Sequence, residues 1–368
     1  MSRQILEGAR RVVVKIGSRL IREAPAARTA ELAAAAAAAR ARGVDLVIVS
    51  SGAIALGVER LALPERPRLM PDLQACAAVG QGRLMQLYDR GFAEVGLAIG
   101  QVLLTHDDLG DRARYLNARH ALTALLALGA TPIINENDTV AIEEITFGDN
   151  DRLAALVTSL VSADVLIVLT DVDGLHDADP AAGGRLIDVV RDIDREALPV
   201  AGGAVLGGVG RGGMASKVMA AKVAGRFGVP TVICSGRHPR VVERVLAGEP
   251  LGTLFVPHVD KLGARKHWIA FTLKPAGAVV VDDGARRALV EGGKSLLPSG
   301  VREVRGGFGP GDAITVMDAA GHELARGLAS YGADEAARIA GKKSAEIEAI
   351  LGYKRTDELV HRDDLVLV

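Results

Sequence analysis

Short apolar runs alternate with longer helical stretches over the first two thirds of the chain. The runs are rich in Val and Ile and predict strands at residues 11–16, 45–49, 99–104, 131–134, 165–169 and 231–234. The stretches between them predict helices at about 29–42, 152–162 and 214–227. Strands that are apolar without alternation are buried on both faces, which indicates an α/β fold with a parallel sheet covered by helices. In such sheets ligands bind beyond the carboxyl ends of the strands, so the residues that follow each strand are the candidates for chemistry.

The pattern changes at residues 251–274, where periodic signals are few and prolines recur at 250, 257 and 275. We expect a linker within this stretch. Beyond it, the sequence predicts strands at 277–282 and 313–316 and short helices at 334–339 and 344–351. The expected organisation is a first domain at 1–258, a linker at 259–274, a small mixed domain at 275–355 and a C-terminal tail at 356–368.

The composition describes a globular chain and excludes several classes of protein. Of the 368 residues, 49% are hydrophobic and 24% are charged, which provides a sizeable core and is unlike a disordered chain. The formal net charge of −1 gives no general attraction for nucleic acid or anionic lipid. Cys76 and Cys234 fit neither a disulfide framework nor a metal-binding spacing, and no apolar run near the start is long enough to span a membrane. We therefore expect a soluble, cytoplasmic protein.

Two successive strand ends carry residues that suit an anion. The first predicted strand runs into KIGS at residues 15–18, where the glycine lets the backbone approach a phosphate and the lysine supplies a compact positive charge. The second ends in SSGA at 50–53, where free N–H groups at a helix start favour a carboxylate or a phosphate. Each segment alone also fits an ordinary turn or helix cap. Their recurrence at neighbouring strand ends favours an anion site.

Segments rich in carboxylates and carboxamides follow later strands. NEND at residues 135–138 and DND at 149–151 could bind an ammonium group or a hydroxyl of a ligand, or fix the position of a lysine side chain. Such residues are also common in turns and helix caps. The strand at 165–169 runs into TDVDG at 170–174, where Asp171 or Asp173 could face a nucleotide or a magnesium ion, although Asp173 followed by Gly174 also fits an ordinary turn. The density of these polar groups favours a functional site.

A glycine-rich loop at residues 207–213 leads into the helix predicted from Met214. Its bare N–H groups can cradle phosphates, and Lys217, one turn into the helix, can reach a transferring group. The loop contains a formal GxGxxG at 208–213, but no apolar strand precedes it and no acidic residue lies near position 233. A dinucleotide-binding fingerprint is therefore not supported, and the residues beside Lys217 exclude a Walker A sequence.

In this order, the segments resemble the amino acid kinase family. The resemblance is carried by VKIGS at 14–18, SGA at 51–53, INEND at 134–138, GDND at 148–151, LTD at 169–171 and GGMASK at 212–217. It spans nearly the whole chain, because LLPSGV at 296–301 and GPGD at 309–312 resemble a PUA domain, which bacterial members of the family often append. The resemblance implies a three-layer sandwich around a mainly parallel sheet, the amino acid kinase fold, followed by a small mixed β/α PUA-like barrel.

The NEND loop and the PUA-like tail resemble the branch of the family that acts on glutamate. That resemblance implies ATP-dependent phosphorylation of the γ-carboxylate of L-glutamate to L-glutamyl 5-phosphate, the first step of proline biosynthesis. Lys15 and Lys217 would be catalytic, and Asp151 would hold both in place. Glutamate would be bound by Ser51, Gly52, Ala53, Asn135, Asp138 and Asn150. The nucleotide would be bound by Lys15, Thr170, Asp171, Arg211, Gly212, Gly213, Met214, Ala215, Ser216 and Lys217.

The resemblance also implies a cofactor and partners. Mg²⁺ would bridge the phosphates of ATP, and no protein ligand for it is assigned. Proline would inhibit by competing with glutamate, with the loop at 139–148 responding. The chain would form a homo-oligomer and could pass its product to glutamate-5-semialdehyde dehydrogenase. Arg211 and His176 stand where the family often has a small polar residue and a tyrosine, respectively.

Two alternative functions are open at this point. PUA modules elsewhere bind RNA, but residues 275–353 hold nine Lys or Arg against eleven Asp or Glu. A domain that binds phosphate backbones is expected to carry a basic surplus, so nucleic acid binding is not expected. A sister kinase that phosphorylates aspartate or acetylglutamate is the other alternative, and a panel of acceptors would distinguish it.

Overall fold

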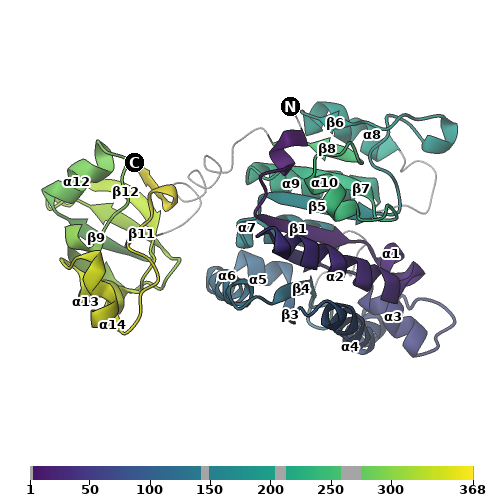
Figure 1. The fold of residues 1–368 in the computed structure, drawn as a ribbon, viewed down its shortest axis with the longest axis horizontal. Helices are drawn as coiled ribbons and strands as arrows, with labels where there is room; N and C mark the ends of the chain where they lie inside the picture. Colours follow the sequence, from purple (N-terminus) through teal and green to yellow (C-terminus); the bar gives the residue numbers. More distant parts are fainter. Residues whose placement is uncertain (1–2, 142–148, 204–212, 258–274, 368) are drawn as a thin grey trace. The chain divides into compact units, whose positions relative to one another are not determined.

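The computed structural model describes residues 3–141, 149–203, 213–257 and 275–367 (Figure 1). The chain divides into two compact units, Met1–Val259 and Asp260–Val368, and each has a hydrophobic core of its own. The predicted linker at 259–274 lies outside the described residues, and the predicted domain boundaries stay predictions.

The first unit is built on an eight-stranded sheet in the order β3-β4-β2-β1-β5-β7-β8-β6. Neighbouring strands are parallel except β7 and β8, which are antiparallel. The strands are β1 (Arg11–Ile16), β2 (Asp45–Val49), β3 (Ile99–Leu104), β4 (Thr131–Glu136), β5 (Val165–Thr170), β6 (Val189–Val190), β7 (Thr231–Ser235) and β8 (Thr253–Phe255). The six predicted strands are confirmed. β8 lies in a stretch for which the pattern predicts no strand.

Helices cover both faces of this sheet (Figure 1), which confirms the three-layer α/β architecture. One layer holds α1 (Ser18–Glu23), α2 (Pro25–Ala41), α3 (Ala53–Arg60), α4 (Met70–Glu94) and α10 (Val241–Leu246). The other holds α5 (His106–Gly110), α6 (Arg112–Ala127), α7 (Asp149–Leu160), α8 (Leu198–Gly203) and α9 (Met214–Arg226). Within β1, Val12 and Val14 pack into the first layer and Val13 into the second. Both faces of the strand are thus buried, which is why its sequence is apolar without alternation.

Helix α4 is the longest helix of the described chain, and the sequence pattern does not predict it. It crosses α3 in direct backbone contact at two glycines. A Cβ atom on Gly80 would lie 1.8 Å from the carbonyl oxygen of Ala53, and one on Gly57 would lie 1.8 Å from that of Cys76. Only glycine allows so close an approach, so the two helices are locked together at this crossing.

The second unit has a five-stranded sheet in the order β10-β9-β11-β12-β13. The strands are β9 (Gly277–Val281), β10 (Val301–Gly306), β11 (Ala313–Met317), β12 (Glu323–Leu328) and β13 (Leu365–Leu367), and the helices are α12 (Asp283–Val290), α13 (Ala333–Ile339) and α14 (Ile347–Leu351). Only β9 and β11 are parallel neighbours. The two strands and two helical pieces predicted here are confirmed.

Short helical turns complete the described chain: η1 (Arg3–Leu6), η2 (Pro180–Ala182), η3 (Ile193–Ala197), η5 (Pro298–Gly300), η6 (Ser344–Glu346) and η7 (Arg362–Asp364). No helix among the described residues combines the length and the apolar character needed to cross a bilayer.

Candidate active site

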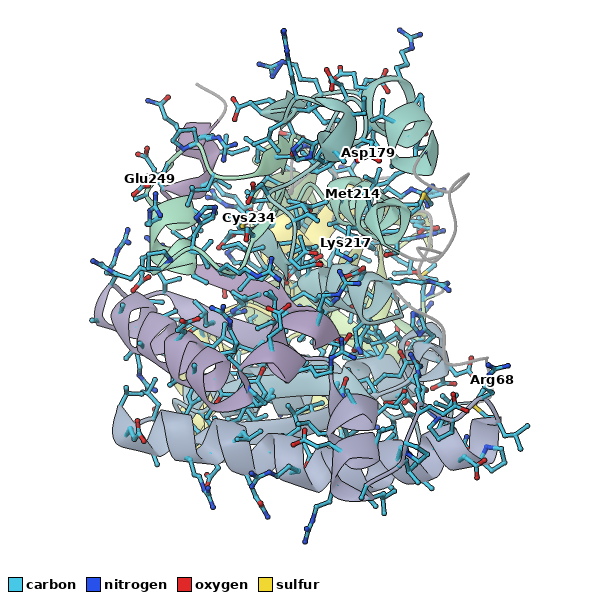
Figure 2. All side chains as sticks on the ribbon, turned by 90° about the vertical axis from the view of Figure 1, so that its right-hand side faces the viewer. Arg68, Asp179, Met214, Lys217, Cys234 and Glu249 are labelled. Atoms are coloured by element: carbon cyan, nitrogen blue, oxygen red, sulfur yellow. The ribbon has the colours of Figure 1, made fainter. Side chains whose placement is uncertain are left out.

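The three charged residues predicted to act together come from different elements at one edge of the first sheet. Lys15 lies near the carboxyl end of β1, paired with Val49 of β2 on one side and Val168 of β5 on the other. Asp151 lies in the first turn of α7, and Lys217 lies in the first turn of α9. Figure 2 shows Lys217 together with Met214 on α9. The fold therefore brings together residues that are far apart in the sequence.

A single buried carboxylate holds both lysines. The Nζ atom of Lys15 lies 2.6 Å from Oδ1 of Asp151, and the Nζ atom of Lys217 lies 3.1 Å from Oδ2. The side chains of Asp151, Lys15 and Lys217 are 1%, 6% and 12% exposed. Ser216 donates a hydrogen bond of 2.8 Å to the same Oδ2, and Lys217 donates one of 3.0 Å to the carbonyl of Gly213. Both ammonium groups are thus fixed relative to each other.

The pKa values of Lys15 and Asp151 are both lowered, but for different reasons. Burial, helped by the positive charge of Lys217, lowers the pKa of Lys15 below its usual 10.5, although Asp151 opposes the shift. Burial alone would raise the pKa of Asp151, but the charges of Lys15 and Lys217 outweigh it and hold that pKa below its usual 3.8. Asp151 is therefore ionised at neutral pH, and the cluster of two cations and one anion attracts a further anion.

The turn after β2 presents a second anion-binding feature. Ser51 is buried, and Gly52 adopts a left-handed conformation with φ of +110° immediately before α3 begins at Ala53. This conformation favours glycine and leaves the first N–H groups of α3 free of partners within the helix. The buried hydroxyl of Ser50 accepts a hydrogen bond of 2.9 Å from Tyr88 of α4. The turn is thereby tied to the helix behind it.

Asn135 and Asn150, two of the residues assigned to glutamate, each have a buried amide oxygen. Asn135, near the end of β4, is 2% exposed and donates a hydrogen bond of 2.8 Å to Gln81. Its Oδ1 atom and that of Asn150 are buried with no hydrogen-bond partner among the described groups. A buried carbonyl oxygen without a donor is costly, so both atoms suit a ligand with N–H groups. Asp138 is half-buried in the turn after β4.

The end of β5 is held by two arginines that the sequence pattern did not single out. Asp171 forms an ion pair with Arg19, and its carbonyl accepts a hydrogen bond of 2.8 Å from Arg237, which also pairs with Glu23 at 2.7 Å. Burial would raise the pKa of Asp171, but the hydrogen bond from Arg19 and related contacts hold it below its usual value. Arg19 and Arg237 each follow a strand end by a few residues, which is the signal that could have found them. Thr170 donates a hydrogen bond of 3.2 Å to Asp171.

The remaining predicted site residues are only partly described. Arg211 and Gly212 lie outside the described residues, as do residues 142–148 of the loop assigned to proline. Met214 and Ala215 are half-buried in the first turn of α9, beside Gly213. His176 contacts the carbonyl of Gly174 through Nδ1 at 3.3 Å.

The described residues contain no cluster of three His, Cys, Asp or Glu side chains that could hold a metal ion. Two carboxylates assigned to the site are both engaged, Asp151 by two lysines and Asp171 by Arg19. A magnesium ion in this site would therefore take its ligands from substrate phosphates and water rather than from a protein cage.

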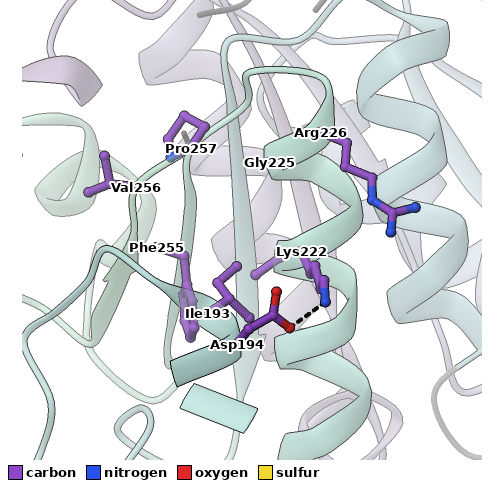
Figure 3. A pocket seen from close by; sticks show the side chains of 9 residues that line it. Ile193, Asp194, Lys222, Gly225, Arg226, Phe255, Val256 and Pro257 are labelled. Atoms are coloured by element: carbon purple, nitrogen blue, oxygen red, sulfur yellow. Dashed lines mark hydrogen bonds and ion pairs between the residues drawn. The ribbon is translucent and has the colours of Figure 1, made fainter. Parts of the chain in front are cut away.

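A separate hollow of about 180 Å³ lies at the C-terminal end of α9 (Figure 3). Phe255, Pro257 and Gly225 line it, and Lys222 forms an ion pair with Asp194 across it. The residues of α9 that line it begin at Ala221, about one turn beyond Lys217. Neither Lys217 nor Asp151 lines the hollow.

Comparison with known proteins identifies several relatives along the full length of the chain. It is 50% identical over 370 residues to the glutamate 5-kinase of Geobacter sulfurreducens, with 99% of both chains covered. It is 52% identical to the glutamate 5-kinase of Chromohalobacter salexigens and 51% identical to that of Myxococcus xanthus, in each case over 100% of this chain and 98% of the relative. Among solved structures, a UMP kinase from Bacillus anthracis aligns with 68% of this chain at 14% identity and a TM-score of 0.46.

Family profiles divide the chain in the same order as its motifs. The profile of the amino acid kinase family matches residues 10–235, and that of the PUA domain matches residues 277–351. The first match includes Lys15, Asp151 and Lys217. The chain is therefore a kinase that belongs to the amino acid kinase family and carries a C-terminal PUA domain.

Proposed function

We propose that this kinase transfers the γ-phosphoryl group of ATP to the γ-carboxylate of L-glutamate, as the first step of proline biosynthesis. The products would be L-glutamyl 5-phosphate and ADP. Identity of about one half to relatives named glutamate 5-kinase, over the whole chain, supports the choice of substrate. The structural observation that carries the proposal is the pair of ammonium groups on the buried carboxylate of Asp151.

The transfer needs charge stabilisation more than it needs a nucleophile from the protein. An oxygen of the glutamate carboxylate attacks the γ-phosphorus of ATP, and the bond from that phosphorus to the bridging oxygen of ADP breaks. Negative charge is spread over the oxygens of the migrating group and the leaving phosphate, so fixed cations accelerate the step. Lys15 and Lys217 supply those cations, and Asp151 holds their positions in the ground state and the transition state alike.

Glutamate has an ammonium group, an α-carboxylate and the reacting γ-carboxylate. The free N–H groups at Gly52 and Ala53 and the hydroxyl of Ser51 suit a carboxylate. The Oδ1 atoms of Asn135 and Asn150, which have no hydrogen-bond partner among the described groups, suit the ammonium group, together with the negative charge of Asp138. These roles follow the predicted assignment of the glutamate-binding residues and rest on the chemistry of the groups.

Thr170, Asp171 and the segment from Arg211 to Lys217 are the proposed nucleotide-binding residues. The N–H groups of the first turn and the positive end of the dipole at the N-terminus of α9 suit phosphate groups. Mg²⁺, when bound to ATP, would neutralise phosphate charge and favour in-line geometry. We also propose, as the family resemblance of the sequence implies, that proline competes with glutamate, that the chain is a cytoplasmic homo-oligomer and that its product passes to glutamate-5-semialdehyde dehydrogenase.

A hydroxamate assay tests the proposed reaction directly. Purified protein is incubated with ATP, Mg²⁺, hydroxylamine and one acceptor at a time from L-glutamate, L-aspartate and N-acetyl-L-glutamate. We expect hydroxamate and ADP in equal amounts with L-glutamate, and a decrease on addition of L-proline that is relieved by more glutamate. Product with a different acceptor alone would make the chain a sister kinase, and inhibition by proline that glutamate does not relieve would contradict the proposed competition.

A further inference from the structure

Three polar side chains of α4 lie on one line along the helix. Gln74, Gln81 and Tyr88 are each seven residues apart, and seven residues make nearly two full turns of an α-helix, so the three share one face. Residues next to this line, such as Leu84, are buried and apolar. We call these three residues the polar line of α4.

The last residue of the line is tied to the turn after β2. The hydroxyl of Tyr88 donates a hydrogen bond of 2.9 Å to Oγ of Ser50, and Ser50 donates one of 3.2 Å to the carbonyl of Ser51. Tyr88 and Ser50 are both fully buried. Because Ser51 and Gly52 follow directly, the tyrosine fixes the turn proposed to bind a substrate carboxylate.

The middle residue determines which way an amide of the site faces. Oε1 of Gln81 accepts a hydrogen bond of 2.8 Å from Nδ2 of Asn135. With its NH₂ group engaged in this bond, Asn135 presents its other polar atom, the buried Oδ1 that has no partner among the described groups. A flipped amide would place two N–H donors where the site needs an acceptor for an ammonium group.

The first residue of the line contacts the segment that follows β4. Nε2 of Gln74 donates a hydrogen bond of 3.3 Å to the carbonyl of Ala141. The three residues thus reach three different chain segments of the amino-acid site. The turn after β2, the end of β4 and the segment after β4 all depend on one helix.

The line is held in place by the close crossing of α3 and α4. Gly80, next to Gln81, lies against the carbonyl of Ala53, and Gly57 lies against that of Cys76. Ala53 is the first residue of α3, directly after the Ser51-Gly52 turn. A site supported by packed helices keeps its geometry better than one supported by loops alone.

We propose that Gln74, Gln81 and Tyr88 are positioning residues that set the affinity for the amino-acid substrate without taking part in nucleotide binding or transfer. This inference rests on the proposed function, because it names the supports of the site to which glutamate is assigned. The hydrogen bonds of the line in the described structure go to Ala141, Asn135 and Ser50, and none of these belongs to the cluster around Asp151.

The test separates amino-acid affinity from nucleotide affinity. In the full-length protein, Gln81→Met keeps the length of the side chain but removes the acceptor. It leaves the NH₂ group of Asn135 without its partner, and we expect KM for L-glutamate to rise about tenfold, which corresponds to loss of one buried hydrogen bond. KM for ATP and kcat should stay within about twofold. Tyr88→Phe should raise the same KM about fivefold by freeing the Ser50 hydroxyl.

Two matched variants complete the test. Gln86→Met changes an exposed glutamine of the same helix and should leave both KM values unchanged. Gln81→Glu retains an acceptor oxygen and should restore glutamate binding to within about threefold of the wild type. Calorimetric titration of L-glutamate without ATP, and thermal unfolding of each variant, distinguish positioning from loss of structure.

A glutamate KM of Gln81→Met equal to that of the wild type would overturn the inference. Equal increases of both KM values, accompanied by a lowered unfolding midpoint, would overturn it as well, since they indicate a general packing role. Failure of the proposed function has a different signature, because the wild type itself would then phosphorylate another acceptor of the panel. The same variants measured with that acceptor would still decide whether the polar line sets its affinity.

Discussion

Replacing Asp151 by asparagine removes the one negative charge to which both lysines of the site are bound. The two side chains have nearly the same shape, so the substitution changes charge and hydrogen bonding rather than packing. In the wild type, Lys15 and Lys217 bind separate oxygens of the carboxylate, at 2.6 and 3.1 Å. A carboxamide offers one oxygen and one NH₂ group, so one ammonium group would face a donor.

The expected magnitude follows from the burial of all three groups. Removing one partner of a buried ion pair costs about 3–5 kcal/mol of stability, because the remaining charge is left without compensation. Here two cations remain, with side chains only 6% and 12% exposed, and we expect the upper part of that range. Lys15 also loses the group that raises its pKa. Because one fixed donor at a transition state is worth about 10²–10³ in rate, kcat should fall by at least about 10².

The assay combines urea unfolding, followed by far-ultraviolet circular dichroism, with hydroxamate formation by the same preparations. Asp194→Asn is the matched control. It breaks the ion pair with Lys222, in which the aspartate side chain is 62% exposed, and exposed pairs contribute at most about 1 kcal/mol. A loss of less than about 1 kcal/mol for Asp151→Asn, with turnover within twofold of the wild type, would refute the reasoning that this carboxylate organises the site.

Four further predictions concern stability, pH and reactivity. Gly80→Ala should destabilise the protein by about 1–3 kcal/mol because its Cβ meets the carbonyl of Ala53, whereas Gly82→Ala, with open space around it, should raise the thermal midpoint slightly. Above pH 3.8, Asp151→Asn should show its full loss of unfolding free energy relative to the wild type, and this loss should shrink as the pH falls through the lowered pKa of Asp151. Urea midpoints of both proteins from pH 3 to 7 would measure the difference, and a difference that stays constant with pH would contradict the prediction. Because the pKa of Lys15 is lowered, activity should decline with rising pH before the usual lysine pKa of 10.5 is reached, and a kcat profile that is flat up to that pH would contradict this. Burial raises the pKa of Cys234 to about 12, so this thiol should not react with an aromatic disulfide reagent at pH 8 until urea unfolds the chain.

The strands were predictable because their environment leaves a direct trace in the sequence. A strand covered by helices on both faces is apolar almost throughout, as in the first five residues of β5, Val165 to Leu169. Strand β8 escaped prediction because it has only three residues. Helix α4 escaped because Gly80, Gly82 and Gly91 resemble breaks in a helix, and only the structure shows that Gly80 marks a crossing of backbones.

The candidate site was predictable in its chemistry but not in its geometry. The residues after strand ends were the candidates for chemistry, because ligands of parallel sheets bind beyond the carboxyl ends of the strands. Spacing alone could not pair Lys15 and Lys217 with Asp151, and it was the resemblance to a family that named them. Arg19, Arg237 and the polar line of α4 were missed. The seven-residue interval between Gln74, Gln81 and Tyr88 is a usable signal only after the helix itself has been recognised.

The cluster around Asp151 has a consequence for how the protein and its substrates depend on each other. Two lysines and one aspartate sum to a single positive charge in a place that water hardly reaches. No further charged side chain of the described residues forms an ion pair with these three groups. In the proposed reaction, a phosphate oxygen that enters the cluster supplies the missing negative charge, so binding of the phosphate and neutralisation of a buried positive charge occur together.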